Sequence, residues 1–142
     1  MFAGVYTKGI PKLERWKKIA TSAAQQSGRD KVPEILEPVK LKQLLTPPAL
    51  PLRKGRKKDG LLKLILSESY NEQNLKDILN AEKDIQQIFL LIGPEGGFSR
   101  EEITSAVKNG FVEVSLGPRI LRTETAPIAT ISIIQYELGD MG

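Results

Sequence analysis

Two short segments in the second half of the sequence carry the residue types that a binding site needs. Residues 93–99 read Gly-Pro-Glu-Gly-Gly-Phe-Ser, and residues 116–126 read Leu-Gly-Pro-Arg-Ile-Leu-Arg-Thr-Glu-Thr-Ala. Each segment follows an apolar run and precedes a helical pattern, so each predicts a turn from a buried strand into a helix. Ligands of open α/β sheets bind at the edge where the strands end. The two segments together therefore predict one composite pocket.

The glycines of residues 93–99 allow a ligand to approach the backbone closely, and a helix that starts just beyond them offers free N–H groups. A phosphate cradle is one interpretation. However, no Lys-Ser or Lys-Thr pair follows the glycines, and the Gly-x-Gly-x-x-Gly pattern is absent. Glu95 would also repel a phosphate. A tight strand-to-helix turn without a ligand is the alternative for this segment.

The second segment combines cations, a carboxylate and hydroxyls beside the predicted start of a helix, and such a mixture is typical of a site. These residues are Arg119, Arg122, Thr123, Glu124 and Thr125. The alternative is a structural role, in which an Arg–Glu pair fixes the helix start and Thr123 or Thr125 caps it.

The composition excludes several kinds of chemistry. The 142 residues contain no histidine and no cysteine. The chain therefore lacks the commonest general base, the commonest metal ligand, thiolate nucleophiles and disulfides, and we expect no metal-dependent catalysis. The sequence has no apolar run long enough to span a membrane and no signal-peptide pattern. It predicts a cytoplasmic protein.

The formal net charge of +4 is unevenly distributed along the chain. Residues 1–31 and residues 53–58 each carry a net charge of +5. Basic segments on a neutral-to-acidic body fit a polyanionic partner such as RNA. A solvated helix face and a lysine-rich loop without a partner are the alternative.

Hydrophobic periodicity and breaker residues predict the elements that must position the two segments. The expected helices cover residues 12–27, 71–83, 99–109 and 125–138, with one or two further helical turns at 41–45. The expected strands cover residues 61–67, 88–92 and 112–116. Residues 32–36 predict a short strand or an extended segment, and residues 46–60 predict a loop.

Several residues mark the expected helix ends. Gly28 and Gly110 predict C-terminal stops, and Asn71 is a possible N-cap. Ser99 and Glu102 have the spacing of a capping box.

The five consecutive apolar residues at 88–92 are typical of a strand buried on both faces. Strands that alternate with helices predict an α/β domain with a mainly parallel sheet flanked by helices. The helix at 125–138 is apolar nearly all round, so we expect it to be buried, either in the core or against another subunit.

The chain resembles the SPOUT, or α/β-knot, RNA methyltransferases. Within that class it is similar to the family that methylates N3 of a uridine in the 16S RNA of the small ribosomal subunit. The resemblance covers nearly the whole chain from about residue 12. The stretches that carry it are residues 91–99, 116–126 and 139–142, with residues 14–20, 25–29 and 32–35 upstream.

The resemblance implies a methyltransferase domain over residues 12–142 with a C-terminal trefoil knot. Residues 1–11 match nothing in the family. The family's N-terminal RNA-binding domain and the first βα unit of its knotted domain are not recognised, so the domain is expected to be incomplete at its N-terminus. The implied partners are ribosomal RNA of the small subunit and a second copy of the chain in a homodimer.

The resemblance also implies S-adenosyl-L-methionine as the cofactor. Backbone groups near Leu116 and Leu121 would bind the adenine edge, and apolar side chains would hold the ring. The implied cofactor-binding residues are Leu66, Ile92, Gly93, Gly97, Leu116, Gly117, Ile120, Leu121, Arg122, Thr125 and Ala126.

The implied reaction is an in-line methyl transfer that needs no metal. The uridine N3 must lose its proton, and the candidates are a carboxylate, Glu124 or Glu95, or stabilisation of the uridine anion by Arg122. We favour Arg122, with Glu124 orienting it. Two alternatives stay open: a truncated, non-catalytic dimer that binds only the cofactor, and a nucleotide-phosphate binder that uses residues 93–99.

Overall fold

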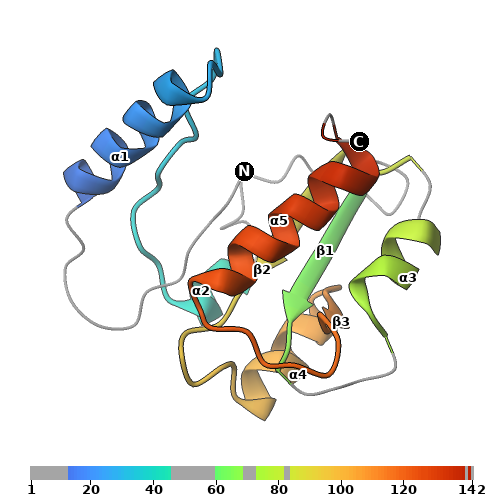
Figure 1. Ribbon diagram of the computed structural model, residues 1–142. Helices are drawn as coiled ribbons and strands as arrows, with labels where there is room; N and C mark the ends of the chain where they lie inside the picture. The colour runs from blue at the N-terminus through green and yellow to red at the C-terminus, as the bar shows by residue number, and fades with distance from the viewer. Residues whose placement is uncertain (1–12, 46–59, 69–72, 82–83, 140, 142) are drawn as a thin grey trace. The chain divides into compact units, whose positions relative to one another are not determined.

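Strand β1 (Leu61–Leu66) lies at the centre of a three-stranded parallel sheet in the computed structural model (Figure 1). The structure describes residues 13–45, 60–68, 73–81, 84–139 and 141. The chain divides into two compact units, Met1–Pro51 and Leu52–Gly142, and the sheet belongs to the second. The predicted loop at 46–60, with its basic cluster, lies outside the described residues except for Gly60.

The sheet order is β2-β1-β3, with β2 spanning Gln87–Leu91 and β3 spanning Val112–Val114. Strand β1 pairs with β2 from Leu61↔Gln87 to Ile65↔Leu91, and with β3 from Leu64↔Val112 to Leu66↔Val114. Both pairings are parallel, as expected from the alternation of strands and helices. The three predicted strands are confirmed, with ends that differ by one or two residues.

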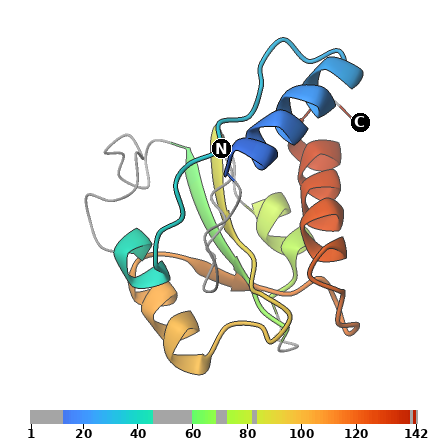
Figure 2. The ribbon, with the colours of Figure 1, turned by 90° about the vertical axis from the view of Figure 1, so that its left-hand side faces the viewer.

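One face of the sheet packs against helices α3 (Leu75–Ala81) and α5 (Thr125–Leu138) (Figure 2). Because side chains alternate along a strand, every second residue of β1 enters this face. The core cluster joins buried side chains of the three strands and α3: Leu62, Leu64, Leu75, Leu79, Leu90 and Val114. Ile134 of α5 packs against it.

The opposite face packs against helix α4 (Arg100–Lys108) and the residues that follow it. The rings of Phe89 and Phe111 meet edge to face, with centroids 5.5 Å apart. Lys63 also points to this side, where its ammonium donates to the Asn109 carbonyl at 3.3 Å, beyond the C-terminal end of α4. The partial negative charge of a helix C-terminus favours a cation there.

The structure confirms some of the predicted helix-capping residues and not others. The Ser99 and Glu102 capping box is present, with Glu102 N–H donating to Ser99 Oγ and Ser99 N–H donating to the Glu102 carboxylate. Helix α3 is capped by Asn74, whose side-chain oxygen accepts from Asp77 N–H at 2.9 Å. The predicted cap, Asn71, lies outside the described residues.

Helix α5 begins as predicted, but its cap differs. Glu124 occupies the N-cap position with helical φ and ψ angles and makes no side-chain cap hydrogen bond. The expectation that Thr123 or Thr125 caps α5 is therefore wrong. The turn is closed by the backbone instead, because the Arg122 carbonyl accepts from the N–H groups of Thr125 and Ala126. The trefoil knot stays a prediction.

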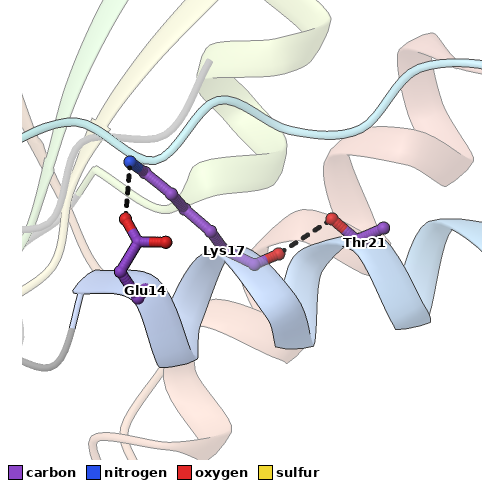
Figure 3. Close-up of polar contacts among 3 residues, drawn as sticks. All are labelled: Glu14, Lys17 and Thr21. Atoms are coloured by element: carbon purple, nitrogen blue, oxygen red, sulfur yellow. Dashed lines mark hydrogen bonds and ion pairs between the residues drawn. The ribbon is translucent and has the colours of Figure 1, made fainter.

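In the first unit the structure describes helices α1 (Leu13–Gln26) and α2 (Leu41–Leu45), both at predicted positions. Residues 32–36 form no strand. Within α1, Lys17 forms an ion pair with Glu14 at 3.1 Å, and Thr21 donates to the Lys17 carbonyl (Figure 3). Gly28 has a φ of 66° and ends α1, as expected.

Candidate functional site

A pocket lies at the carboxyl edge of the sheet, where the three strands end. Its walls come from the residues after β1, β2 and β3 and from the first turn of α5. The described lining residues are Leu66, Ser67, Glu68, Ile92, Gly93, Pro94, Gly97, Leu116, Gly117, Arg119, Ile120, Leu121, Thr123 and Ala126. The two segments that the sequence singled out therefore meet in one pocket.

The sheet topology explains why a crevice forms there. Helix α3 follows β1 on one face of the sheet, whereas α4 follows β2 on the other. The chain therefore leaves these two neighbouring strands in opposite directions, and a ligand site opens between such strands in α/β folds. The side chains that floor the pocket also belong to the core, because Leu66, Ile92 and Leu116 pack against the core cluster.

The turn after β2 has a shape that requires glycine. Gly97 has a φ of 66°, a conformation that L residues rarely adopt. Its N–H donates to the Pro94 carbonyl at 2.8 Å and closes the turn. Gly93 and Gly97 lie in backbone contact, since a Cβ on Gly93 would come within 3.0 Å of the Gly97 carbonyl carbon. These glycines keep one wall of the pocket as bare backbone.

The loop after β3 forms another wall. Gly117 has a φ of 100°, and a Cβ added to it would meet no atom within 4 Å. The space on the Cβ side of Gly117 is therefore unoccupied. Ile120 lines the pocket although the residue is 70% exposed.

Two charged side chains line the pocket. Among the described lining residues, Glu68 supplies the carboxylate and Arg119 the guanidinium. Both side chains are exposed, and in the described part of the chain no ion pair joins them. The remaining lining is apolar side chain, hydroxyl and backbone.

Nine of the predicted cofactor-binding residues line this pocket: Leu66, Ile92, Gly93, Gly97, Leu116, Gly117, Ile120, Leu121 and Ala126. Arg122 and Thr125 do not line it. Sequence reasoning missed five lining residues: Ser67, Glu68, Pro94, Arg119 and Thr123. Pro94, Arg119 and Thr123 belong to the two recognised segments, and their positions between predicted residues could have indicated them.

Arg122 and Glu124, the predicted catalytic pair, are exposed at the start of α5. Among the described residues, no ion pair or side-chain hydrogen bond joins them. In this structure, Glu124 therefore makes no contact that would orient the Arg122 side chain. The two residues nevertheless lie in the loop that carries Leu121 and Thr123 of the pocket.

The described residues contain no group of three or more Asp, Glu, His or Cys side chains that could hold a metal ion. Within the same residues, none of the helices combines the length and apolarity needed to cross a bilayer.

Comparison with known proteins places this arrangement in a family. The family model of the RNA methyltransferase domain matches residues 4–135, which is most of the chain. The chain belongs to this family. The match includes all three strands and both loops of the pocket.

Curated relatives of this RNA methyltransferase domain include two proteins named ribosomal RNA small subunit methyltransferase E. The protein of Mesomycoplasma hyopneumoniae is 40% identical over 82% of this chain and 45% of its own length. The Bacillus subtilis protein is 34% identical over 92% of this chain and 49% of its own length. The chain thus spans about half the length of these relatives.

Solved structures show the same fold. A ribosomal RNA small subunit methyltransferase E from Neisseria gonorrhoeae, bound to S-adenosyl methionine, matches with a TM-score of 0.77 and 36% identity. The match covers 92% of this chain and 50% of that protein. A Legionella pneumophila protein, solved in complex with the cofactor SAM, matches with a TM-score of 0.71 and 38% identity. This match covers 88% of this chain and 46% of that protein.

Proposed function

We propose that this RNA methyltransferase domain transfers a methyl group from S-adenosyl-L-methionine to ribosomal RNA, at N3 of a uridine in the 16S RNA of the small subunit. One observation carries the proposal. The two glycine-containing loops, about 25 residues apart in the sequence, form a single pocket at the carboxyl edge of the sheet. The names of the relatives and the S-adenosyl methionine bound in the Neisseria protein support the same function.

The residues of the pocket fit the cofactor. Leu66, Leu116 and Leu121 offer apolar surface for an adenine ring, and the backbone at Gly117, which also lines the pocket, offers polar groups for its edge. The bare backbone at Gly93 and Gly97 allows close approach of a ribose. When bound, the cofactor supplies an electrophilic methyl group on its sulfonium, so this chain's residues need only position the groups and handle a proton.

Arg122 and Glu124 are proposed to act on the uridine at the rim of this pocket. The N3 atom loses a proton before or during transfer, and the Arg122 guanidinium would stabilise the negative charge that develops on the base. Glu124 would accept the proton, and Glu95 is the other candidate acceptor. Both side chains of the pair are exposed, so a nucleotide can reach them.

The cations of α1 support RNA as the partner. Arg15 and Lys18 are exposed and one helical turn apart, and Arg29 is exposed just beyond the helix. Lys17 is engaged with Glu14 (Figure 3), whereas no ion pair holds the other three cations within the described residues. Unpaired cations on a helix surface contact phosphates without reading sequence.

We further propose that the protein acts as a homodimer in the cytoplasm. Helix α5 is apolar nearly all round, yet its buried residues are Ala126 and Thr130, while Ile128 and Tyr136 are 68% and 65% exposed. Within the described residues α5 is therefore only partly buried. The exposed apolar side chains of α5 support its burial against a second copy of the chain.

The proposal is tested in two steps on the chain as it stands. Calorimetric titration with S-adenosylhomocysteine should show saturable binding, and purified small ribosomal subunits that lack the modification should then accept labelled methyl groups at a uridine. Binding without methylation would indicate a cofactor-binding fragment without productive RNA contact. No binding to a folded sample would refute the proposal.

A further inference from the structure

The pocket contains opposite charges on two of its walls. Glu68 follows β1 and Arg119 lies in the loop after β3, and both line the same space. From this pair we infer that Glu68 and Arg119 bind the zwitterionic amino-acid end of the cofactor, with Glu68 facing its cationic groups and Arg119 facing its carboxylate. The inference rests on the proposed function, because it assumes an adenosyl-methionine type of ligand.

The position of Glu68 is fixed by the sheet. The preceding residue, Ser67, is buried and donates its N–H to the Val114 carbonyl of β3 at 2.9 Å. This hydrogen bond extends the pairing of β1 with β3 to the residue before Glu68. Glu68 is consequently held at the pocket, between the ends of β1 and β2.

The Glu68 side chain lies against Gly97. A Cβ added to Gly97 would lie 3.4 Å from Glu68 Cδ and 3.5 and 3.6 Å from its two carboxylate oxygens. The Gly97 N–H already donates to Pro94, so it does not neutralise this carboxylate. Among the described residues, no hydrogen bond or ion pair to Glu68 is present. The negative charge is thus available to a cationic ligand group.

Arg119 provides the complementary charge. Its side chain is exposed, and no ion pair to it exists in the described part of the chain. Opposite charges that line one pocket without pairing are each free to bind a ligand group of opposite sign. A guanidinium can bind a carboxylate through two parallel hydrogen bonds, which suits the α-carboxylate of a methionyl group.

The ligand that fits both charges has an ammonium or sulfonium near Glu68 and a carboxylate near Arg119. S-adenosylmethionine carries all three groups, and S-adenosylhomocysteine lacks the sulfonium charge. 5′-Methylthioadenosine keeps the adenosine but has neither the ammonium nor the carboxylate. These three ligands therefore separate recognition of the amino-acid end from recognition of the nucleoside.

The experiment compares the binding of these ligands by calorimetry in Glu68→Gln and Arg119→Gln, which preserve side-chain size more closely than alanine. Each variant should bind S-adenosylmethionine about tenfold or more weakly, because an interaction with a charged group of the ligand is lost. Affinity for 5′-methylthioadenosine should stay unchanged. Glu101→Gln and Arg100→Gln are matched controls, since both residues are exposed in the first turn of α4 and do not line the pocket.

A further comparison locates the cation that Glu68 faces. Equal losses for S-adenosylmethionine and S-adenosylhomocysteine in Glu68→Gln place the ammonium beside Glu68, whereas a larger loss for S-adenosylmethionine places the sulfonium there. Unchanged affinity for S-adenosylmethionine, or an equal loss for 5′-methylthioadenosine, would overturn the inference. Wild-type binding of the cofactor would still support the proposed function in that case. Absence of wild-type binding to all three ligands would overturn both.

Discussion

Gly93 and Gly97 hold the two ends of the turn after β2 in direct backbone contact. A Cβ on Gly93 would lie 3.0 Å from the Gly97 carbonyl carbon, 3.1 Å from its Cα and 3.2 Å from the Phe98 nitrogen. These neighbours are backbone atoms of a hydrogen-bonded turn, so they cannot yield as the end of a flexible side chain would. The contact fixes one wall of the pocket.

Gly93→Ala should therefore destabilise the fold by about 1–3 kcal/mol, the usual cost of overpacking, and weaken the binding of S-adenosylhomocysteine. Gly96→Ala is the matched control in the same turn, because a Cβ there would meet no atom within 4 Å and its φ is not positive. Denaturant unfolding and calorimetry measure the two effects. Equal free energies of unfolding and equal ligand affinities for the two variants would contradict the close contact between Gly93 and Gly97.

Loss of the capping box of α4 should lower the free energy of unfolding without affecting methyl transfer. Ser99→Ala removes the acceptor of the Glu102 N–H and should lower the free energy of unfolding by about 1 kcal/mol. Ser99→Thr should restore most of it. Ser105→Ala, an exposed serine inside the same helix, should cost little because alanine favours helix. A larger loss for Ser105→Ala would show that the cap is unimportant.

Much of this fold follows from local patterns. The apolar segments at 61–67 and 88–92 and the alternating apolar and polar residues at 112–116 predict the three strands, and glycines mark the turns beyond the last two. Nine pocket residues followed from the resemblance. Glu68 did not, because it lies in no motif. Only the sheet order, with β1 between β2 and β3, brings it beside Gly97, and linear spacing does not specify that order.

The exact ends of the helices also depend on tertiary contacts that the linear sequence does not specify. Asn71 and Asn74 both precede the same amphipathic pattern, and the choice between them depends on where the chain leaves the sheet. Asn74 lies at an isolated parallel bridge with Ser115, next to β3, and this tertiary contact fixes the start of α3. The start of α5 is likewise closed by backbone hydrogen bonds to Arg122 rather than by a threonine cap.

Arg122 should separate cofactor binding from catalysis. Because its side chain does not line the pocket, Arg122→Ala should leave the affinity for S-adenosylhomocysteine nearly unchanged. It should slow methyl transfer in single-turnover assays by about 100-fold, the usual loss when one stabilising donor is removed. Arg100→Ala, an exposed arginine of α4, should do neither. Normal turnover in Arg122→Ala would remove this residue from the mechanism.

The exposed apolar side chains of α5 predict self-association. Ile128 and Tyr136 lie two helical turns apart, on the same side of α5. Ile128→Arg combined with Tyr136→Arg should shift sedimentation from dimer to monomer, because two charges would be placed against an apolar surface. Val107→Arg changes an exposed apolar residue of α4 and should leave the assembly intact. A monomeric wild-type chain would contradict the proposed dimer.

The cations of α1 predict a salt-dependent contribution to RNA affinity. Neutralising Arg15, Lys18 and Arg29 to glutamine should lower the slope of log affinity against log salt by about 2, because three cations would no longer neutralise RNA phosphates. Lys17→Gln is the control on the same helix, since Lys17 already pairs with Glu14. Filter binding to small-subunit RNA at several salt concentrations measures the slope. An unchanged slope would indicate a merely solvated helix.

Leu66, Ile92 and Leu116 serve the core and the pocket at once. A ligand that contacts these side chains binds only the folded chain, so it would raise the free energy of unfolding by an amount that grows with its free concentration relative to its Kd. Cofactor binding and folding would then be thermodynamically linked. The melting temperature of the chain would report how much cofactor is present, and a substitution deep in the sheet would change cofactor affinity without touching the ligand.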